Sequence, residues 1–237
     1  MESANEDASA AVLVDDEEGL RDALGRGADP NFRFFLDENY GHFTLLTYAA
    51  CFGLDGCCYL LLARGADPNL SDGYETPMHK ACLEQVTNDP RLVKCLSHLL
   101  DAGVDPNLRY KDGYTALHYA CKSPLEPGVK LFIQRGSNIE ATTNYGMTPL
   151  GIAVSCNCRK TALTLLRAGA KLKVLKYASI SLENRKLNDY MVGICNEGGW
   201  AARVRKHEDA CLRVVSRCAP LPRDVMLSIV SYWSLPH

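Results

Sequence analysis

Two histidines in the same local sequence are the first residues that could carry chemistry. His79 lies in the segment TPMHKAC of Thr76–Cys82, and His118 lies in TALHYAC of Thr115–Cys121. A histidine can act as a general acid or base or as a metal ligand. However, the chain has no recognisable nucleophile motif, no glycine-rich phosphate loop and no His-Glu-x-x-His segment. We therefore predict that both histidines are structural and that the protein is not an enzyme.

The cysteines are the second group that could react or bind metal. There are 11 of them, an odd number, scattered along the chain. The candidates for metal binding, Cys57–Cys58 with Cys156 and Cys158, lack the Cys-x-x-Cys spacing of zinc sites. We predict reduced cysteines that serve as small packing residues, with no metal and no cofactor.

These residues belong to phrases that recur along the chain. Gly-Ala-Asp-Pro-Asn begins at Gly27 and again at Gly65, a valine variant begins at Gly103, and weaker copies begin at Gly136 and Gly169. The steps between these glycines are 38, 38, 33 and 33 residues. The histidine phrase runs in phase with them, and related copies are Thr44–Ala50 and Thr148–Val154. A period near 33 predicts stacked repeats that present a long surface to a partner.

Each repeat has the signals of two helices and a turn. Threonine opens the first helix as its N-cap, and Pro77 and Pro149 suit the first turn. The glycine of the first phrase ends the second helix in a left-handed conformation. The turns that follow are expected at Asp72-Gly73, Asp112-Gly113 and Asn144–Gly146.

The two phrases together resemble ankyrin repeats, whose signature is Thr-Pro-Leu-His-x-Ala. The resemblance covers roughly residues 11–177. It implies an all-α ankyrin-repeat solenoid with short β-hairpin fingers, in which the histidines bond neighbouring turns. It also implies a non-catalytic function in binding another protein.

The expected domain order follows from the repeats. Residues 1–10 are acidic and expected to be disordered, and a degenerate repeat occupies 11–39. Four further repeats are expected at 40–72, 73–111, 112–144 and 145–177. The finger 32–43 is longer than the later ones and aromatic, and an insertion falls near Gln85–Leu92.

Tyrosines dominate the predicted partner-binding positions. One residue of each first helix is expected to face the concave groove: Tyr48, Lys80, Tyr119 and Ile152. Residues beside the finger tips are expected at its edge: Tyr74, Tyr110, Asp112, Tyr114 and Tyr145. Tyrosine suits an interface because it combines a large apolar area with a hydroxyl group. The alternative, that several of these tyrosines pack between adjacent fingers, stays open at this point.

The last segment, 178–237, admits three interpretations. It is expected to be a helical C-terminal cap that covers the last repeat. Alternatively, Leu221–Tyr232 is similar to the start of an F-box, and Pro220-Leu-Pro222 is similar to part of a SOCS box. Either box would make the chain a substrate-recruiting adaptor of a cullin-type ubiquitin ligase. The candidate adaptor-binding residues are Leu221, Pro222, Val225, Ile229 and Trp233.

The composition is that of an ordinary globular protein. The chain has 237 residues, is 47% hydrophobic and 23% charged, and carries a net charge of −2. This charge does not indicate nucleic acid or membrane as a partner, and there is neither a long apolar run nor a secretory signal. We expect a monomer in the cytoplasm or nucleus that binds a protein partner.

Overall fold

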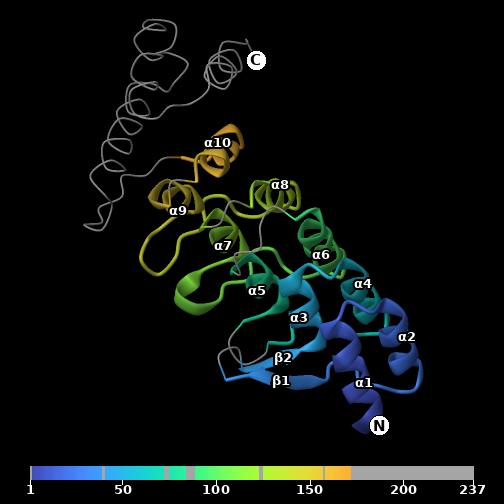
Figure 1. Ribbon diagram of the computed structural model, residues 1–237. Coiled ribbons are helices and arrows are strands. Elements are labelled where there is room, and N and C mark those ends of the chain that lie inside the picture. The colour runs from blue at the N-terminus through green and yellow to red at the C-terminus, as the bar shows by residue number, and fades with distance from the viewer. Residues whose placement is uncertain are drawn as a thin grey trace, which may run out of the picture. The chain divides into compact units, whose positions relative to one another are not determined.

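The computed structural model describes residues 2–38, 41–71, 75–83, 89–122, 125–156 and 158–171. The predicted cap or adaptor segment at 178–237 and Tyr74 lie outside these residues. The described part is an array of five helix pairs, shown in Figure 1. The fold is therefore the helical repeat array that the sequence predicts.

The helices alternate between two rows. The inner row contains α1 (Glu2–Leu13), α3 (Leu45–Phe52), α5 (Pro77–Leu83), α7 (Ala116–Lys122) and α9 (Pro149–Ser155). The outer row contains α2 (Glu17–Gly25), α4 (Asp55–Ala63), α6 (Pro90–Asp101), α8 (Glu126–Gln134) and α10 (Arg159–Arg167). Each helix packs on its pair mate and on the next helix of its own row. Small buried residues in the inner row, among them Ala49, Ala81, Ala120 and Ala153, allow this close approach.

The predicted ends of the helices are present. Thr44 Oγ1 accepts a hydrogen bond from Thr47 N at 3.0 Å, and Thr148 Oγ1 accepts one from Gly151 N at 3.1 Å. At the ends of the outer helices the residue after the glycine donates back five residues, as Val104 N does to Leu99 O at 3.3 Å. This pattern is the Schellman motif, which requires the left-handed glycine. Gly103 accordingly has φ +87°.

The fingers between the pairs differ in structure. The first contains two antiparallel strands, β1 (Arg33–Asp37) and β2 (Gly41–Thr44), with a bulge between Phe35 and Asp37. The third contains only a 3₁₀ turn, η1 (Lys111–Gly113). Asparagine side chains join neighbouring fingers: Asn31 Oδ1 accepts from Asp67 N at 2.8 Å, and Asn107 Oδ1 accepts from Asn138 N at 2.6 Å.

The N-terminal segment corrects one prediction. Residues 1–10 were expected to be disordered, but α1 begins at Glu2. Four residues of α1 are buried: Ala4, Ala8, Ala11 and Val12. They recur at helical spacing, and their small size lets α1 pack closely against α2 despite its acidic outer face. The first helix pair is therefore complete.

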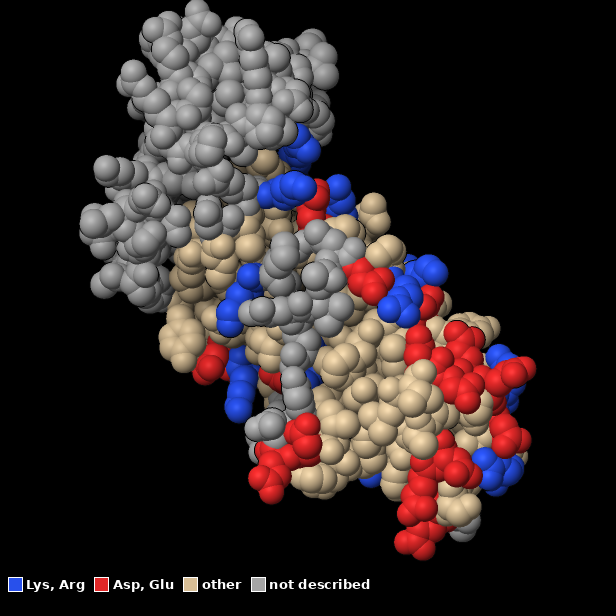
Figure 2. Space-filling model, viewed as in Figure 1, with Lys and Arg blue, Asp and Glu red and all other residues tan. Residues whose placement is uncertain are grey.

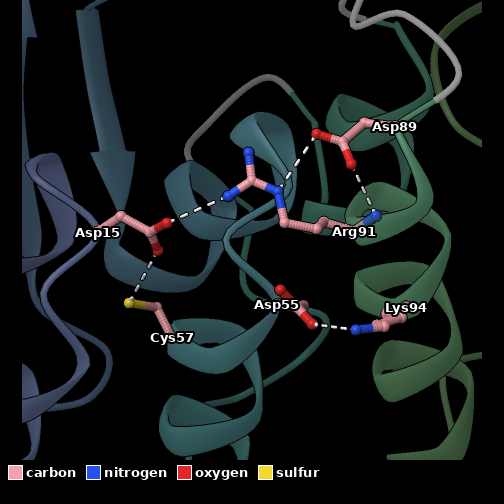
Figure 3. A network of polar contacts seen from close by, with 6 residues as sticks. All are labelled: Asp15, Asp55, Cys57, Asp89, Arg91 and Lys94. Atoms are coloured by element: carbon pink, nitrogen blue, oxygen red, sulfur yellow. Dashed lines mark hydrogen bonds and ion pairs between the residues drawn. The ribbon is translucent and has the colours of Figure 1, made fainter.

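A polar network crosses the array at the turns between inner and outer helices (Figure 3). Arg91 at the start of α6 reaches Asp15, in the turn after α1, at 3.3 Å and also contacts Asp89. Lys94 contacts Asp55 at 3.1 Å, and the Cys57 thiol lies 3.9 Å from Asp15. The network therefore connects the first and third helix pairs, 76 residues apart in sequence.

Candidate protein-interaction surface

The two histidines connect the inner helices α5 and α7 to the fingers. Each histidine bonds the finger that follows its own helix pair. Nδ1 of His79 lies 2.7 Å from Thr76 Oγ1, and Nε2 lies 3.1 Å from the carbonyl oxygen of Leu108. Because Nε2 faces a carbonyl group, it must carry the proton and donate. His118 repeats the arrangement, accepting from Thr115 N at Nδ1 and facing the carbonyl oxygens of Ala141 and Met147 with Nε2. Both rings are buried, so their role is structural.

Burial changes the acidity of both rings. Desolvation lowers the pKa of His118 to about 4, against the hydrogen bonds to Met147 and Ala141, which raise it. The pKa of His79 is also lowered by burial. The imidazoles are therefore neutral at physiological pH, as their hydrogen bonds require.

The predicted groove positions on the inner helices differ in exposure. Tyr48 on α3 is half-buried and lies in an aromatic group with Phe34, Phe43 and Phe52, the last at 4.4 Å between ring centroids. Tyr119 on α7 is only 9% exposed. Ile152 on α9 is 5% exposed. This burial favours packing for Tyr119 and leaves Tyr48 as the better candidate for contact.

Lys80 on α5 is a charged residue among these positions, and its side chain contacts both an acidic residue and an aromatic ring. Its Nζ lies 3.7 Å from Glu75 Oε2, and 14% and 13% of the two side chains are exposed. The same nitrogen lies 5.2 Å from the centroid of the Phe43 ring. The ion pair and the ring hold the lysine side chain in place, because a largely desolvated ion pair is stable only when its partners are close.

The third finger brings several predicted residues close to the inner helices. Tyr114 lies 5.2 Å from Tyr119 and 5.7 Å from His118, between ring centroids. Tyr110 lies 5.4 Å from His79 and is half-buried, while Asp112 is exposed. Ring contacts therefore connect this finger with the inner helices α5 and α7.

The finger tips are held in place by main-chain contacts. Asn144 N donates to Asp112 O at 2.7 Å, and Tyr110 N donates to Tyr114 O at 2.7 Å. Tyr145, the next tip residue, is 53% exposed. A rigid tip with an exposed tyrosine is a favourable interface feature, because little ordering entropy is lost on binding.

Sequence reasoning missed two residues of this surface. Phe52 at the end of α3 is 37% exposed and stacks on Tyr48. Glu75 stands just before α5 and partners Lys80. Neither lies in a repeated phrase at a variable position. The sequence signal nearest to Phe52 is the aromatic content of the first finger, with Phe34, Phe35 and Phe43.

Charge is unevenly distributed over the face drawn in Figure 2. Asp and Glu gather at the N-terminal end of the array, where α1, α2 and α4 lie, and the face over α3 and the first finger carries few charges. Residues 2–71, of those described, have thirteen acidic against four basic side chains, whereas 75–171 have seven against twelve. A partner that lies along the array would therefore meet a negative electrostatic potential at the N-terminal end and a positive one toward the other end.

Most of the described cysteines are buried in the array. The described cysteines are free, and six are buried: Cys51, Cys57, Cys58, Cys82, Cys95 and Cys121. Within the described ranges no group of three or more His, Cys, Asp or Glu could hold a metal ion. None of the helices described is long and apolar enough to cross a membrane.

Comparison with known proteins identifies the repeats. A family model described as "Ankyrin repeats (3 copies)" matches residues 78–176, and one described as "Ankyrin repeat" matches residues 41–73. Together the two models match more than half of the chain.

Several curated proteins are similar to this chain. "Nuclear factor NF-kappa-B p105 subunit" of Gallus gallus is 33% identical over 162 residues, which are 68% of this chain and 16% of that protein. "Ankyrin repeat and SOCS box protein 6" of Homo sapiens is 31% identical over 154 residues, 60% of this chain and 35% of that protein. "Ankyrin repeat protein B18" of Vaccinia virus (strain Copenhagen) is 35% identical over 99 residues, 33% of this chain and 17% of that protein. The chain thus spans about a third or less of these relatives.

Proposed function

The chain belongs to the ankyrin repeat family, and from its surface we propose that it is a non-catalytic module that binds a partner protein through its fingers and inner helices. Members of this family generally mediate protein–protein interactions. The proposal is supported mainly by the aromatic residues of the inner helices and fingers, from Tyr48 on α3 to Tyr145 at the fourth finger. Tyrosine and other aromatic residues are the commonest anchors of protein interfaces.

The partner site is proposed to consist of Tyr48, Lys80, Tyr110, Tyr114 and Tyr145, with Asp112 at the tip. Tyr119 is proposed as a packing residue of this site, because its ring is nearly covered. Tyr74 completes the predicted set but lies outside the described residues.

The proposal can be tested with two exposed tyrosines, one in a finger and one on an outer helix. Tyr145→Ala should weaken capture of the partner from a cell extract by roughly 30-fold or more, as truncation of a good anchor does. Tyr59→Ala is the matched control, since Tyr59 is 58% exposed but lies on the outer helix α4. Thermal unfolding should be the same for both variants. Equal loss of the captured protein in both, or in neither, would argue against the finger surface.

A second candidate function is that of a ubiquitin-ligase adaptor. The similarity to a human protein named for its SOCS box favours it. The residues that would bind the ligase, Leu221, Pro222, Val225, Ile229 and Trp233, lie outside the described residues. The test is co-purification of a cullin adaptor with the full chain and its loss in Leu221→Ala with Pro222→Ala. Retention of the repeat-bound partner by the same variant would separate the two functions.

A further inference from the structure

The first finger ends in a strand edge that no other described element covers. β1 and β2 form a two-stranded sheet, and β2 continues into α3. The main contact of β1 is β2, whereas β2 also packs on α3. In Figure 1, β1 accordingly lies at the border of the array.

The main chain of β1 offers hydrogen-bonding groups at this edge. Leu45 N donates to Phe32 O at 3.2 Å, which makes these two residues a hydrogen-bonded pair of the antiparallel ladder. Bonded and non-bonded pairs alternate along such a ladder. Arg33 and Phe35, opposite Thr44 and His42, therefore point their N–H and C=O groups away from β2. Among the described residues no other element supplies hydrogen-bond partners to these main-chain groups.

The side chains of the edge are apolar at the centre and charged at the ends. Phe35 is 55% exposed and lies edge-on to His42, with 5.2 Å between the ring centroids. Arg33 precedes it by two residues and Asp37 follows it by two. The opposite face of the strand carries the buried Phe34 instead, which packs toward Tyr48. The exposed aromatic ring is thus a feature of the edge and not of the groove.

We propose that two copies of the chain associate through the β1 edge, with their β1 strands antiparallel and Phe35 at the two-fold axis. In this register Arg33 of each copy lies opposite Asp37 of the other, and the two Phe35 rings form a cross-strand pair. The long arginine side chain can reach across the bulge between Phe35 and Asp37. The order basic, aromatic, acidic makes the strand complementary to itself, which favours a second copy over another extended segment.

The association is weak and depends on protein concentration. A strand of five residues buries much less than the roughly 1,200 Å² at which stable interfaces begin. The bulge and the charged ends also shorten the usable edge. The chain is therefore monomeric when dilute, as the sequence predicts, and dimeric when concentrated. This interface is separate from the groove of the proposed function, so one can fail without the other.

The test is sedimentation velocity on the full chain from micromolar to millimolar concentration. We expect the mass to rise from one chain toward two. Arg33→Asp and Asp37→Arg should each abolish this rise, because like charges then face each other at both ends. An equimolar mixture of the two variants should restore a dimer, because one copy is acidic at both ends and the other is basic at both.

Controls separate this edge from other causes. Arg33 also donates to Ser71 O at 2.6 Å within its own chain, so circular dichroism must show that each variant folds. Phe35→Ser, which keeps both charges, should reduce the dimer as well, whereas Tyr145→Ser at another exposed ring should not. A chain that stays monomeric throughout, or a dimer that neither charge reversal weakens, would overturn the proposal. A mixture of the two reversed variants that stays monomeric would overturn it too.

Discussion

At the scale of single residues, the repeated phrases assign a role to each position, and the exceptions are informative. Gly103 follows the rule: its φ of +87° is one that residues with a side chain rarely adopt, yet a Cβ atom there would meet nothing within 4 Å. The cost of substitution is therefore conformational and not steric.

We expect Gly103→Val to destabilise the protein by about 1–2 kcal/mol through backbone strain alone. Gly25→Val is the control, because Gly25 ends α2 in open space without a positive φ. Urea midpoints of the two variants check the difference. Equal midpoints would show that the strain is released by local rearrangement.

Ser137 is an exception to the repeated phrase, because a polar residue follows the glycine in this repeat. The equivalent residue is alanine or valine in the other repeats, at Ala28, Ala66, Val104 and Ala170. The Ser137 hydroxyl is buried and has no hydrogen-bond partner among the residues that the structure describes. Since an unsatisfied buried hydroxyl costs free energy, we expect Ser137→Ala to stabilise the protein by about 1 kcal/mol. A lower unfolding midpoint in urea would mean that the hydroxyl has a partner such as bound water.

His118 gives the array a dependence on pH. Burial lowers its native pKa to about 4, while the unfolded value is about 6.5. Above pH 6.5 both states hold neutral rings and the contribution is complete. As the pH falls from 6.5 toward 4, only the unfolded state takes up the proton, so stability falls by about 1.4 kcal/mol per pH unit from this residue.

The measurement is the urea midpoint between pH 6.5 and 5, above the range where most carboxylates titrate. His118→Gln should be less stable at pH 7 but should lose less stability over this interval. The same slope in both proteins would assign the pH dependence to other groups.

At the scale of elements, the helix pairs could be predicted because each one carries its own start, stop and apolar stripe. The sequence also indicated the long first finger from its length and aromatic residues. It did not predict α1, because the buried stripe of this helix consists of three alanines and one valine, which give a weak apolar signal among the acidic side chains. It also could not tell Tyr119 from Tyr48, since their exposure depends on the rings that the neighbouring helices and fingers place around them.

The ion pairs in the network of Figure 3 connect different elements but are partly exposed, so each one should contribute little to stability. The side chains of Arg91 and Asp15 are 51% and 39% exposed. A double-mutant cycle of Arg91→Met and Asp15→Ala should therefore give a coupling below about 1 kcal/mol. A larger value would show that the pair fixes the turn after α1, where Asp15 has φ +58°.

At the scale of the molecule, stability should follow the order of the pairs along the array. Apart from the exposed Arg91–Asp15 contact between the first and third pairs, the described helix pairs pack mainly on their neighbours, so the array approximates a one-dimensional chain of coupled units. Leu117 on α7 and Leu165 on α10 are both fully buried, but Leu117 lies between two neighbouring pairs and Leu165 lies in the last described pair. Truncation of each creates a cavity that costs about 2–5 kcal/mol locally.

The two substitutions should therefore differ in how far their effects spread. Leu117→Ala weakens the contacts that connect the first three pairs with the last two, so amide hydrogen exchange should accelerate from α5 through α10. Leu165→Ala should accelerate exchange in α9 and α10 and leave α3 to α6 protected, because terminal units open without the rest. Uniform acceleration along the array in both variants would show that it unfolds as a single unit. In that case the free energy of the interfaces between neighbouring helix pairs exceeds the differences in stability among the individual pairs. The proposed partner surface would then be ordered along the whole described array.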